Sequence, residues 1–171
     1  MFKTRQILLT AVAALFMCGL AGCSEAPATG DGRPGADGRS SARELAAFRT
    51  AIRAKYDLKE QAFRDNDPEP ILTRFYTEDV ISTDNEGHTH VGRDALRPLY
   101  EEVIAANVRI ESFSSLVNGD AGWDWVNFHV TLPPEAETDP FTFKMLFLWE
   151  KIDGEWWSHG EMYVPGEFEI R

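Results

Sequence analysis

Cysteine is nearly absent from this chain. Its 171 residues contain two cysteines, Cys18 and Cys23, both near the N-terminus. The remaining chain therefore has no disulfide framework and no cysteine that could act as a nucleophile. Gly-rich phosphate loops and Ser-His-Asp signatures are also missing, so the sequence points to neither phosphate binding through such a loop nor serine-based nucleophilic catalysis.

Positive charge is scarce as well. Lys and Arg number 17 against 28 Asp and Glu, which gives a formal net charge of −11. The first 22 residues contribute only Lys3 and Arg5, so a chain without them carries −13. An acidic surface repels nucleic acid and anionic lipid headgroups. We therefore expect no nucleic-acid partner for the folded part of the chain.

The N-terminal apolar run, residues 7–20, is too short for an ordinary membrane span. Lys3 and Arg5 precede this run, which is the order found in a secretory signal peptide. The next residues, Leu20-Ala21-Gly22-Cys23, resemble the lipobox of bacterial lipoproteins at all four positions. That resemblance implies cleavage before Cys23 and lipid attachment at this cysteine. An ordinary signal peptide, in which the cysteine is incidental, is the alternative.

The lipobox resemblance predicts a location and a domain organisation. Diacylglyceryl and N-acyl chains such as palmitate would exceed the two signals that stable anchoring requires. By analogy with Gram-negative lipoproteins, Ser24 after the cysteine implies the periplasmic face of the outer membrane in the bacterial cell envelope. Residues 1–22 would be the lipoprotein signal peptide and residues 23–40, rich in Gly, Pro, Ala, Ser and Asp, a lipidated flexible tether. Residues 41–171 would form one folded domain.

Three helices are predicted at the start of this domain. Ser41-Ala42-Arg43-Glu44 has the spacing of a capping box, and apolar residues then recur every three or four positions to about residue 63. Asp67 and Pro68 are typical of the start of a short second helix. A third helix is expected after Gly92.

The rest of the chain predicts strands. A short strand is expected at residues 80–84, followed by longer ones at 108–117, 123–132, 141–150 and 155–163. Asp153-Gly154 joins the last two as a tight hairpin turn, because glycine takes positive φ without steric cost. Helices followed by an antiparallel meander indicate an α+β domain with its helices on one face of the sheet.

Residues 44–164 resemble the nuclear transport factor 2-like (NTF2-like) superfamily, which includes ketosteroid isomerases and SnoaL-like polyketide cyclases. Three segments carry this resemblance: Phe75-Tyr76-Thr77-Glu78-Asp79-Val80, Gly92-Arg93-Asp94-Ala95-Leu96 and Ile152-Asp153-Gly154-Glu155-Trp156-Trp157. The resemblance implies a cone: a curved antiparallel sheet wrapped around a long N-terminal helix, with three helices in all. Superfamily members often dimerise through the open face of the sheet, which makes a homodimer an expectation. The same cone serves enzymes, binding modules and assembly domains.

Asp84 is the first catalytic candidate, because the resemblance to isomerases places it at their catalytic aspartate. A carboxylate in an apolar cone would have a raised pKa and could move a proton next to a carbonyl. The alternative is that Asp84 opens the turn to Gly87, where Asp is common. The isomerase oxyanion hole has no match near Lys59 on the helix or near Phe147 in the sheet, which argues against steroid isomerisation.

Glu161 and His159 are the other catalytic candidates. Ser158-His159-Gly160-Glu161 resembles the last-strand segment of the cyclases, and this implies Glu161 as the proton-transfer residue with His159 as its neighbour. Residues at a spacing of two share a face of a strand: Trp157, His159, Glu161 and Tyr163. A one-residue slip in register would turn this set outward and bring Trp156 and Met162 inward.

Aromatic and histidine side chains are the candidates for ligand binding. The expected set is Tyr56, Trp125, His129, Trp157 and Tyr163. On the strand at 123–132, the face with Trp125 and His129 suits a wet pocket or a dimer surface, whereas the opposite face is more apolar. His88 and His90 lack a second ligand pair nearby, so we predict no metal site, and no cofactor either.

These observations predict a membrane-anchored lipoprotein whose SnoaL-like domain binds a small apolar or carbonyl-containing ligand in its cone. One alternative is a cofactor-free proton-transfer enzyme, isomerase-like or cyclase-like, that uses Asp84, His159 and Glu161. Another is a dimeric interaction module of the cell envelope. Convergence of the three side chains inside the cone would favour the enzyme.

Overall fold

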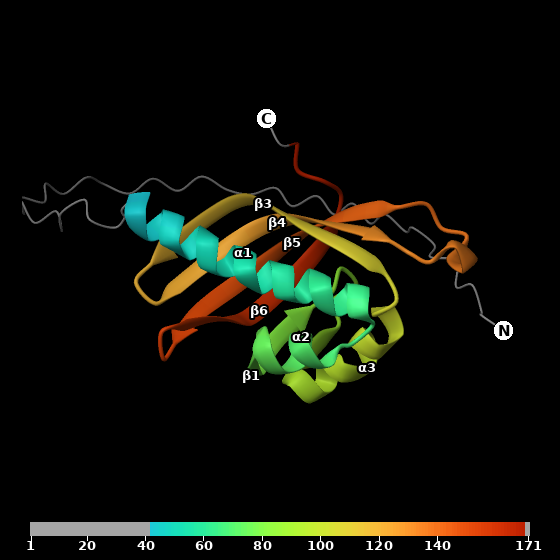
Figure 1. The fold of residues 1–171 in the computed structure, drawn as a ribbon, viewed down its shortest axis with the longest axis horizontal. Helices are drawn as coiled ribbons and strands as arrows, with labels where there is room; N and C mark the ends of the chain where they lie inside the picture. Colours follow the sequence, from blue (N-terminus) through green and yellow to red (C-terminus); the bar gives the residue numbers. More distant parts are fainter. Residues whose placement is uncertain (1–41, 170–171) are drawn as a thin grey trace, which may run out of the picture. The chain divides into compact units, whose positions relative to one another are not determined.

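One long helix, α1 (Ala42–Asp65), lies across a curved sheet (Figure 1). The computed structural model describes residues 42–169, which belong to a single compact unit. The expected signal peptide at 1–22, Cys23 and the tether at 23–40 lie outside the described residues. Within residues 42–169, no helix combines the length and the apolar character needed to cross a membrane.

Two shorter helices, α2 (Glu69–Arg74) and α3 (Arg93–Val103), lie near the C-terminal end of α1 (Figure 1). Gly92 precedes α3 with φ 84°, a backbone conformation that glycine adopts without the steric cost of a Cβ. Its N–H donates to the carbonyl of Val80 at 2.8 Å, which ties the start of α3 to the first strand. A 3-10 turn, η1 (Pro134–Ala136), lies in the loop between the fourth and fifth strands.

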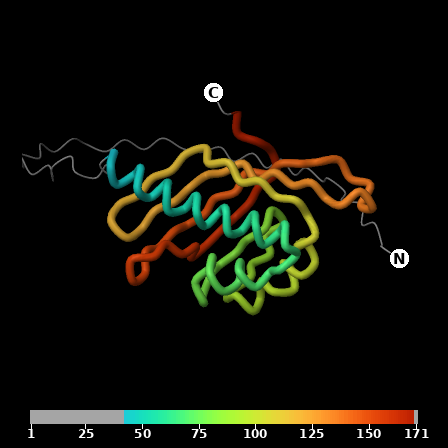
Figure 2. The backbone as a smooth tube through the Cα atoms, viewed as in Figure 1, coloured from blue at the N-terminus to red at the C-terminus, as the bar shows by residue number. Residues whose placement is uncertain are grey.

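Six strands form one curved sheet in the order β2-β1-β6-β5-β4-β3 (Figures 1 and 2). Their bounds are β1 (Tyr76–Thr83), β2 (Thr89–Val91), β3 (Asn107–Asn118), β4 (Ala121–Thr131), β5 (Phe141–Ile152) and β6 (Glu155–Pro165). Three helices and a curved sheet around the long first helix confirm the predicted α+β cone.

One strand pair differs from the expected antiparallel arrangement. β1 pairs with β6 in parallel, whereas β3 to β6 form the expected antiparallel meander. The hydrophobic period of a segment predicts a strand but carries no information on its partner, so the sequence could not reveal this pair. The parallel register sets Ser82 beside Glu161.

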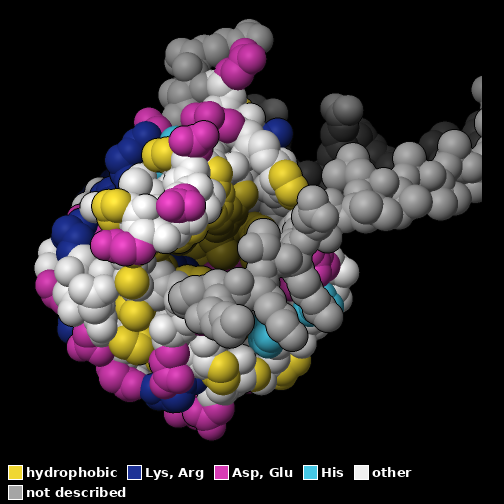
Figure 3. All heavy atoms as spheres, turned by 90° about the vertical axis from the view of Figure 1, so that its right-hand side faces the viewer, with side chains coloured by type: hydrophobic (Ala, Val, Ile, Leu, Met, Phe, Trp, Pro, Cys, Tyr) yellow, Lys and Arg dark blue, Asp and Glu magenta, His cyan; other side chains and the backbone are white. Residues whose placement is uncertain are grey.

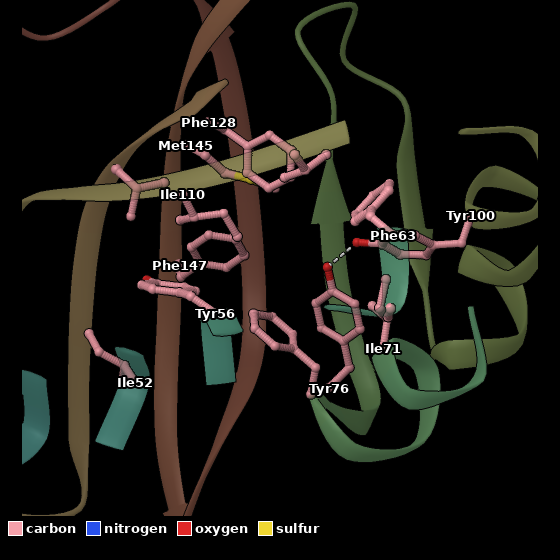
Figure 4. Packing of buried hydrophobic residues seen from close by; sticks show 14 of the residues in the cluster. Ile52, Tyr56, Phe63, Ile71, Tyr76, Tyr100, Ile110, Phe128, Met145 and Phe147 are labelled. Carbon is pink, nitrogen blue, oxygen red and sulfur yellow. Dashed lines mark hydrogen bonds between the residues drawn. The ribbon is translucent and has the colours of Figure 1, made fainter. Parts of the chain in front are cut away.

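The core lies between α1 and the concave face of the sheet. Aromatic rings interlock there at centroid distances typical of edge-on contacts, such as 4.8 Å for Phe48 with Trp156 and 5.5 Å for Phe75 with Phe147. Figure 4 shows other core rings that converge from α1, β1, α3 and the meander: Tyr56, Phe63, Tyr76, Tyr100, Phe128 and Phe147. Such pairs add to the free energy gained by removing apolar surface from water.

Asp124 on β4 is fully buried, and its carboxylate joins α1 to the sheet. It accepts hydrogen bonds from Tyr56 Oη at 2.9 Å and from the hydroxyls of Ser112 and Ser115, each at 2.7 Å. Burial raises the pKa of Asp124, and the three donors oppose that shift by stabilising the anion. Tyr56 therefore has a structural partner at the sheet.

Replacing Tyr56 with Phe removes one of these donors and leaves a lone pair of Asp124 buried without its partner. We expect the free energy of unfolding to fall by about 1–3 kcal/mol, measured by urea denaturation of residues 41–171. Tyr163→Phe is the control, because the Tyr163 hydroxyl has no hydrogen-bond partner within residues 42–169, and should change stability by less than ~0.5 kcal/mol. Equal effects of the two substitutions would contradict the role given to Asp124.

Candidate functional site

A cavity of about 270 Å³ opens at the end of the cone formed by the C-terminal half of α1, α3 and the sheet. Figure 3 shows this end of the molecule hollowed, with hydrophobic side chains lining the hollow. The apolar wall consists of Phe63, Leu99, Val103, Ala106, Val108, Phe128, Val130, Leu132, Phe141, Phe143 and Met145. A wall of this kind favours an apolar ligand.

Polar side chains meet at one place on the cavity surface, and we call them the polar cluster: Lys59, Tyr76, Ser82, Tyr100 and Glu161. Lys59 Nζ donates to Tyr76 Oη at 2.6 Å, and Tyr76 Oη donates to Glu161 Oε2 at 2.5 Å. Ser82 Oγ donates to the other carboxylate oxygen at 3.0 Å. All five members are buried, and all except Tyr76 line the cavity.

Proton counting assigns the remaining bond in the cluster, between Tyr76 and Tyr100 (Figure 4). A tyrosine hydroxyl has one proton to donate, and the Tyr76 proton goes to Glu161. Tyr100 therefore donates to Tyr76, and Tyr76 accepts from both Lys59 and Tyr100. Burial, followed by the charge of Glu161, raises the pKa of both tyrosines well above the usual value, so both hydroxyls stay protonated.

Lys59 is the most unusual member of this cluster, because a lysine ammonium is seldom buried and this one is almost wholly removed from water. Its side chain is 1% exposed, and Nζ lies 3.5 Å from Glu161 Oε2. Burial lowers the pKa of Lys59 to about 8, although the carboxylate acts in the opposite direction.

Aromatic rings surround the same nitrogen. Lys59 Nζ lies 4.5 Å from the ring centroid of Phe75, 4.8 Å from Tyr76 and 5.0 Å from Phe147. The rings of Tyr100 and Phe128 follow at 5.3 and 5.6 Å. Ring faces attract a cation and so offset part of the desolvation cost.

A bulge in β6 decides which side chains of this strand reach the cavity. Gly160 pairs with Leu148 but Ser158 pairs with Trp149, so His159 is an extra residue on β6. The alternation of inward and outward side chains along β6 is therefore shifted by one residue after the bulge, relative to the alternation before it. Glu161 therefore faces into the cone, as does Trp156 before the bulge.

The prediction that four residues of β6 share one face is therefore wrong in part. Glu161 and Tyr163 line the cavity, whereas Trp157 and His159 lie on the outer face. Strict alternation holds only for a strand without bulges. Gly160 was the available signal, since a glycine inside a strand often marks a bulge or a close approach. A Cβ there would lie 3.3 Å from Leu148 Cδ1 and 3.4 Å from the Ile81 carbonyl oxygen.

The outward residues have partners of their own. Trp157 lies between two cations, with Lys55 Nζ at 4.3 Å and the guanidinium carbon of Arg93 at 5.6 Å from its ring centroid. His159 Nδ1 lies 3.6 Å from Asp79 Oδ1 and 3.4 Å from Thr77 Oγ1. Neither side chain belongs to the cavity.

Asp84 lies in the turn after β1, outside the cavity. Its carboxylate accepts the backbone N–H groups of Glu86 and His88, each at 2.8 Å, and pairs with His88 Nδ1 at 2.8 Å. Desolvation acts to raise its pKa, but the bonds from His88 and Glu86 outweigh it and hold the pKa below the usual value. The environment is thus the reverse of the apolar one expected for an isomerase-like base, and it fits the turn alternative.

Of the five residues expected to bind ligand, Tyr163 lines the cavity. Tyr56 is buried in the core against Asp124. Trp125 is on the outer face, with its ring 5.6 Å from that of Phe168. His129 is on the same face, where Nδ1 lies 2.8 Å from Thr142 Oγ1. Trp157, described above, is outside as well.

Sequence reasoning missed four of the five cluster members: Lys59, Tyr76, Ser82 and Tyr100. Lys59 did leave a signal, because it is the one polar residue that interrupts the apolar face of the first helix. A charge at a core position needs a buried partner, and this pointed to a carboxylate elsewhere in the core. The sequence contains no signal for Ser82, because its place beside Glu161 depends on the parallel pairing of β1 and β6.

The outer face of the sheet carries exposed apolar side chains: Ile81, Leu148, Met162 and Val164. They come from the neighbouring strands β1, β5 and β6. The homodimer expected from the sequence stays a prediction.

Comparisons with known proteins agree with this architecture. A family model described as a SnoaL-like domain matches residues 52–159. Similar solved structures include an NTF2-like protein of unknown function from Pseudomonas putida, with a TM-score of 0.60 and 18% identity over 73% of this chain and 90% of that one. A ketosteroid isomerase-like protein from Erwinia carotovora atroseptica has a TM-score of 0.59 and 20% identity, over 74% and 99% of the two chains.

A protein of unknown function from Mycobacterium tuberculosis has a TM-score of 0.62 and 21% identity, over 75% of this chain and 78% of that chain. A search among curated proteins gave no match. At these identities the solved structures support the fold alone, whereas the family model covers more than half of the chain. The chain therefore belongs to the SnoaL-like domain family, within the NTF2-like fold.

Proposed function

We propose that the domain binds a small, largely apolar molecule with one hydrogen-bonding end. The observation that carries this proposal is the contrast within one cavity, where an apolar wall surrounds a buried polar cluster. Apolar pockets with a few convergent polar groups are typical of small-molecule sites, in which the wall supplies affinity and the polar groups fix orientation.

The polar cluster favours a neutral ligand that accepts hydrogen bonds. Lys59 and Glu161 carry opposite charges, so together they leave no excess charge for an anionic or cationic ligand to neutralise. Lys59 supplies the donor at the cavity surface, because its ammonium has three protons and donates one of them to Tyr76. A carbonyl oxygen fits this arrangement, and the ketosteroid isomerase-like name of one structural neighbour agrees with a carbonyl-containing ligand.

A bulky side chain placed in the cavity tests the binding proposal. Acetophenone, an apolar ring with one carbonyl, is titrated into isotope-labelled residues 41–171 and followed by NMR. Val103→Trp on α3 fills the cavity, and we expect it to weaken binding about tenfold or more, which corresponds to ~1.4 kcal/mol. Val91→Trp is the matched control, because Val91 is 64% exposed and outside the cavity lining. Chemical-shift changes confined to residues on the outer face of the sheet would contradict the proposal.

Proton transfer next to a carbonyl is the second candidate function, and the position of Glu161 favours it. This carboxylate lines the cavity beside the hydroxyls of Tyr76 and Ser82. Asp84 and His159 lie outside, so an enzyme built on this cavity would use Glu161 as its base without them.

Deuterium exchange at the methyl group of acetophenone in heavy water measures this activity directly. We expect Glu161→Gln to slow catalysed exchange by about a hundredfold or more, since removal of a general base has effects of that order. Asp84→Asn should leave the rate unchanged, because its side chain pairs with His88 in an exposed turn. An unchanged rate in Glu161→Gln would rule out this role for Glu161.

We further propose that Cys23 anchors the chain to the cell envelope through lipid, as its lipobox-like context implies. Alkyne-labelled palmitate fed to a bacterium that expresses the full chain should label the wild-type protein, and Cys23→Ser should remove the label. Cys18→Ser is the control and should keep it, because Cys18 precedes the expected cleavage site. Label retained in Cys23→Ser would contradict the anchor.

A further inference from the structure

Lys59 brings a primary amine to the surface of an apolar cavity, and binding of a neutral ligand does not by itself require one. A lysine is almost never fully buried unless its charge is paired. Here the oxygen nearest to Nζ belongs to Tyr76, at 2.6 Å, while the Glu161 carboxylate is 3.5 Å away. The hydroxyl of Tyr76 thus lies between the two charges, and the direct ion pair is long.

The surroundings of Nζ resemble those that make a lysine nucleophilic. Desolvation disfavours the ammonium, and this lowers the pKa of Lys59 to about 8. At neutral pH about a tenth of the molecules then carry a free amine, against about one in a thousand or fewer for an ordinary exposed lysine. Lysines in hydrophobic pockets attack carbonyl carbons for this reason.

We propose that Lys59 forms a reversible Schiff base with an aldehyde or ketone held in the cavity. This inference rests on the proposed binding function and defines its ligand as a carbonyl compound. The geometry that supports it is an amine lining an apolar cavity, with a carboxylate 3.5 Å away and two hydroxyls at the same place.

The bond changes balance with these groups alone. The neutral amine of Lys59 attacks the carbonyl carbon, and Glu161 carries one proton from the nitrogen to the former carbonyl oxygen, which gives a carbinolamine. The nitrogen lone pair then expels the hydroxyl, Glu161 carries the second N–H proton to that oxygen, and water departs. The amine has then lost two hydrogens, the carbonyl has lost its oxygen, and a C=N bond has formed. No oxidant or reductant takes part, and hydrolysis reverses the sequence.

Reductive trapping tests the proposal on residues 41–171. Benzaldehyde and cyanoborohydride convert an imine to a stable benzylamine, and peptide mass mapping then locates the adduct. We expect Lys59 to be the most rapidly labelled lysine at pH 7, ahead of the exposed Lys151. Val103→Trp should reduce labelling of Lys59 at least tenfold and leave Lys151 unchanged. Lys59→Arg and Lys59→Met lack the amine and should lose only this adduct.

The pH dependence separates cavity chemistry from surface chemistry. Because the neutral amine is the reactive form, labelling of Lys59 should rise about tenfold from pH 7 to pH 9 and level off above it. Labelling of an exposed lysine should continue to rise above pH 9.

A parallel titration with benzyl alcohol, which has the same ring but no carbonyl, distinguishes two kinds of failure. Labelling that favours Lys59 and is blocked by Val103→Trp supports the Schiff base. Benzyl alcohol binding in the cavity without an adduct on Lys59 overturns the Schiff base and leaves reversible binding intact. An adduct on Lys59 that Val103→Trp does not reduce also overturns it. If benzyl alcohol does not bind and no adduct forms on Lys59, both proposals are overturned.

Discussion

The ammonium of Lys59 can lie inside the cone only because other groups compensate it there. An isolated charge in an apolar interior is very costly, and the protein lowers this cost with a hydroxyl, a carboxylate and five aromatic rings. Lys59 itself is on α1, and the compensating groups come from α3, from several strands of the sheet and from Phe75 before β1, so the cluster depends on α1, α3 and the sheet together. The residual cost remains as a depressed pKa of Lys59, which is also the property that makes its amine reactive.

Two irregularities of the sheet bring the partners of Lys59 into place. The bulge at His159 turns Glu161 inward, and without it the regular alternation from Trp156 would direct Glu161 to the outer face. The parallel pairing of β1 with β6 then sets Ser82 beside Glu161, where its hydroxyl holds the carboxylate oxygen that Tyr76 does not. Bulges that re-aim a side chain next to a functional site are a recurrent feature of curved sheets.

Most of the fold could be predicted from the sequence, and less of the site. Hydrophobic period and turn residues located all three helices and the antiparallel meander, because both are local properties of the chain. The cavity depends on non-local facts: which strand pairs with β1, and where alternation in β6 breaks. The predicted inward position is correct for Glu161 and Tyr163, which follow the bulge. It is wrong for Trp157, which precedes the bulge. Gly160 and Lys59 were the two local departures from pattern that marked the site.

The position of Asp84 changes what chemistry the cavity can support. Two carboxylates would have divided acid and base roles between them, as in the isomerase pattern. With Asp84 held in an exposed turn by His88, the ionisable groups at the cavity are an amine, a carboxylate and protonated tyrosines. A carboxylate alone can remove a proton next to a carbonyl, whereas an amine beside it can also bond to the carbonyl carbon. If Lys59 forms an imine, the protonated C=N group withdraws electrons more strongly than the ketone does, and Glu161 then faces a more acidic C–H. Binding, covalent capture and proton transfer would thus be successive uses of one cluster: Val103→Trp blocks the cavity that all three require, Lys59→Met removes the amine that covalent capture requires, and Glu161→Gln removes the carboxylate that proton transfer requires.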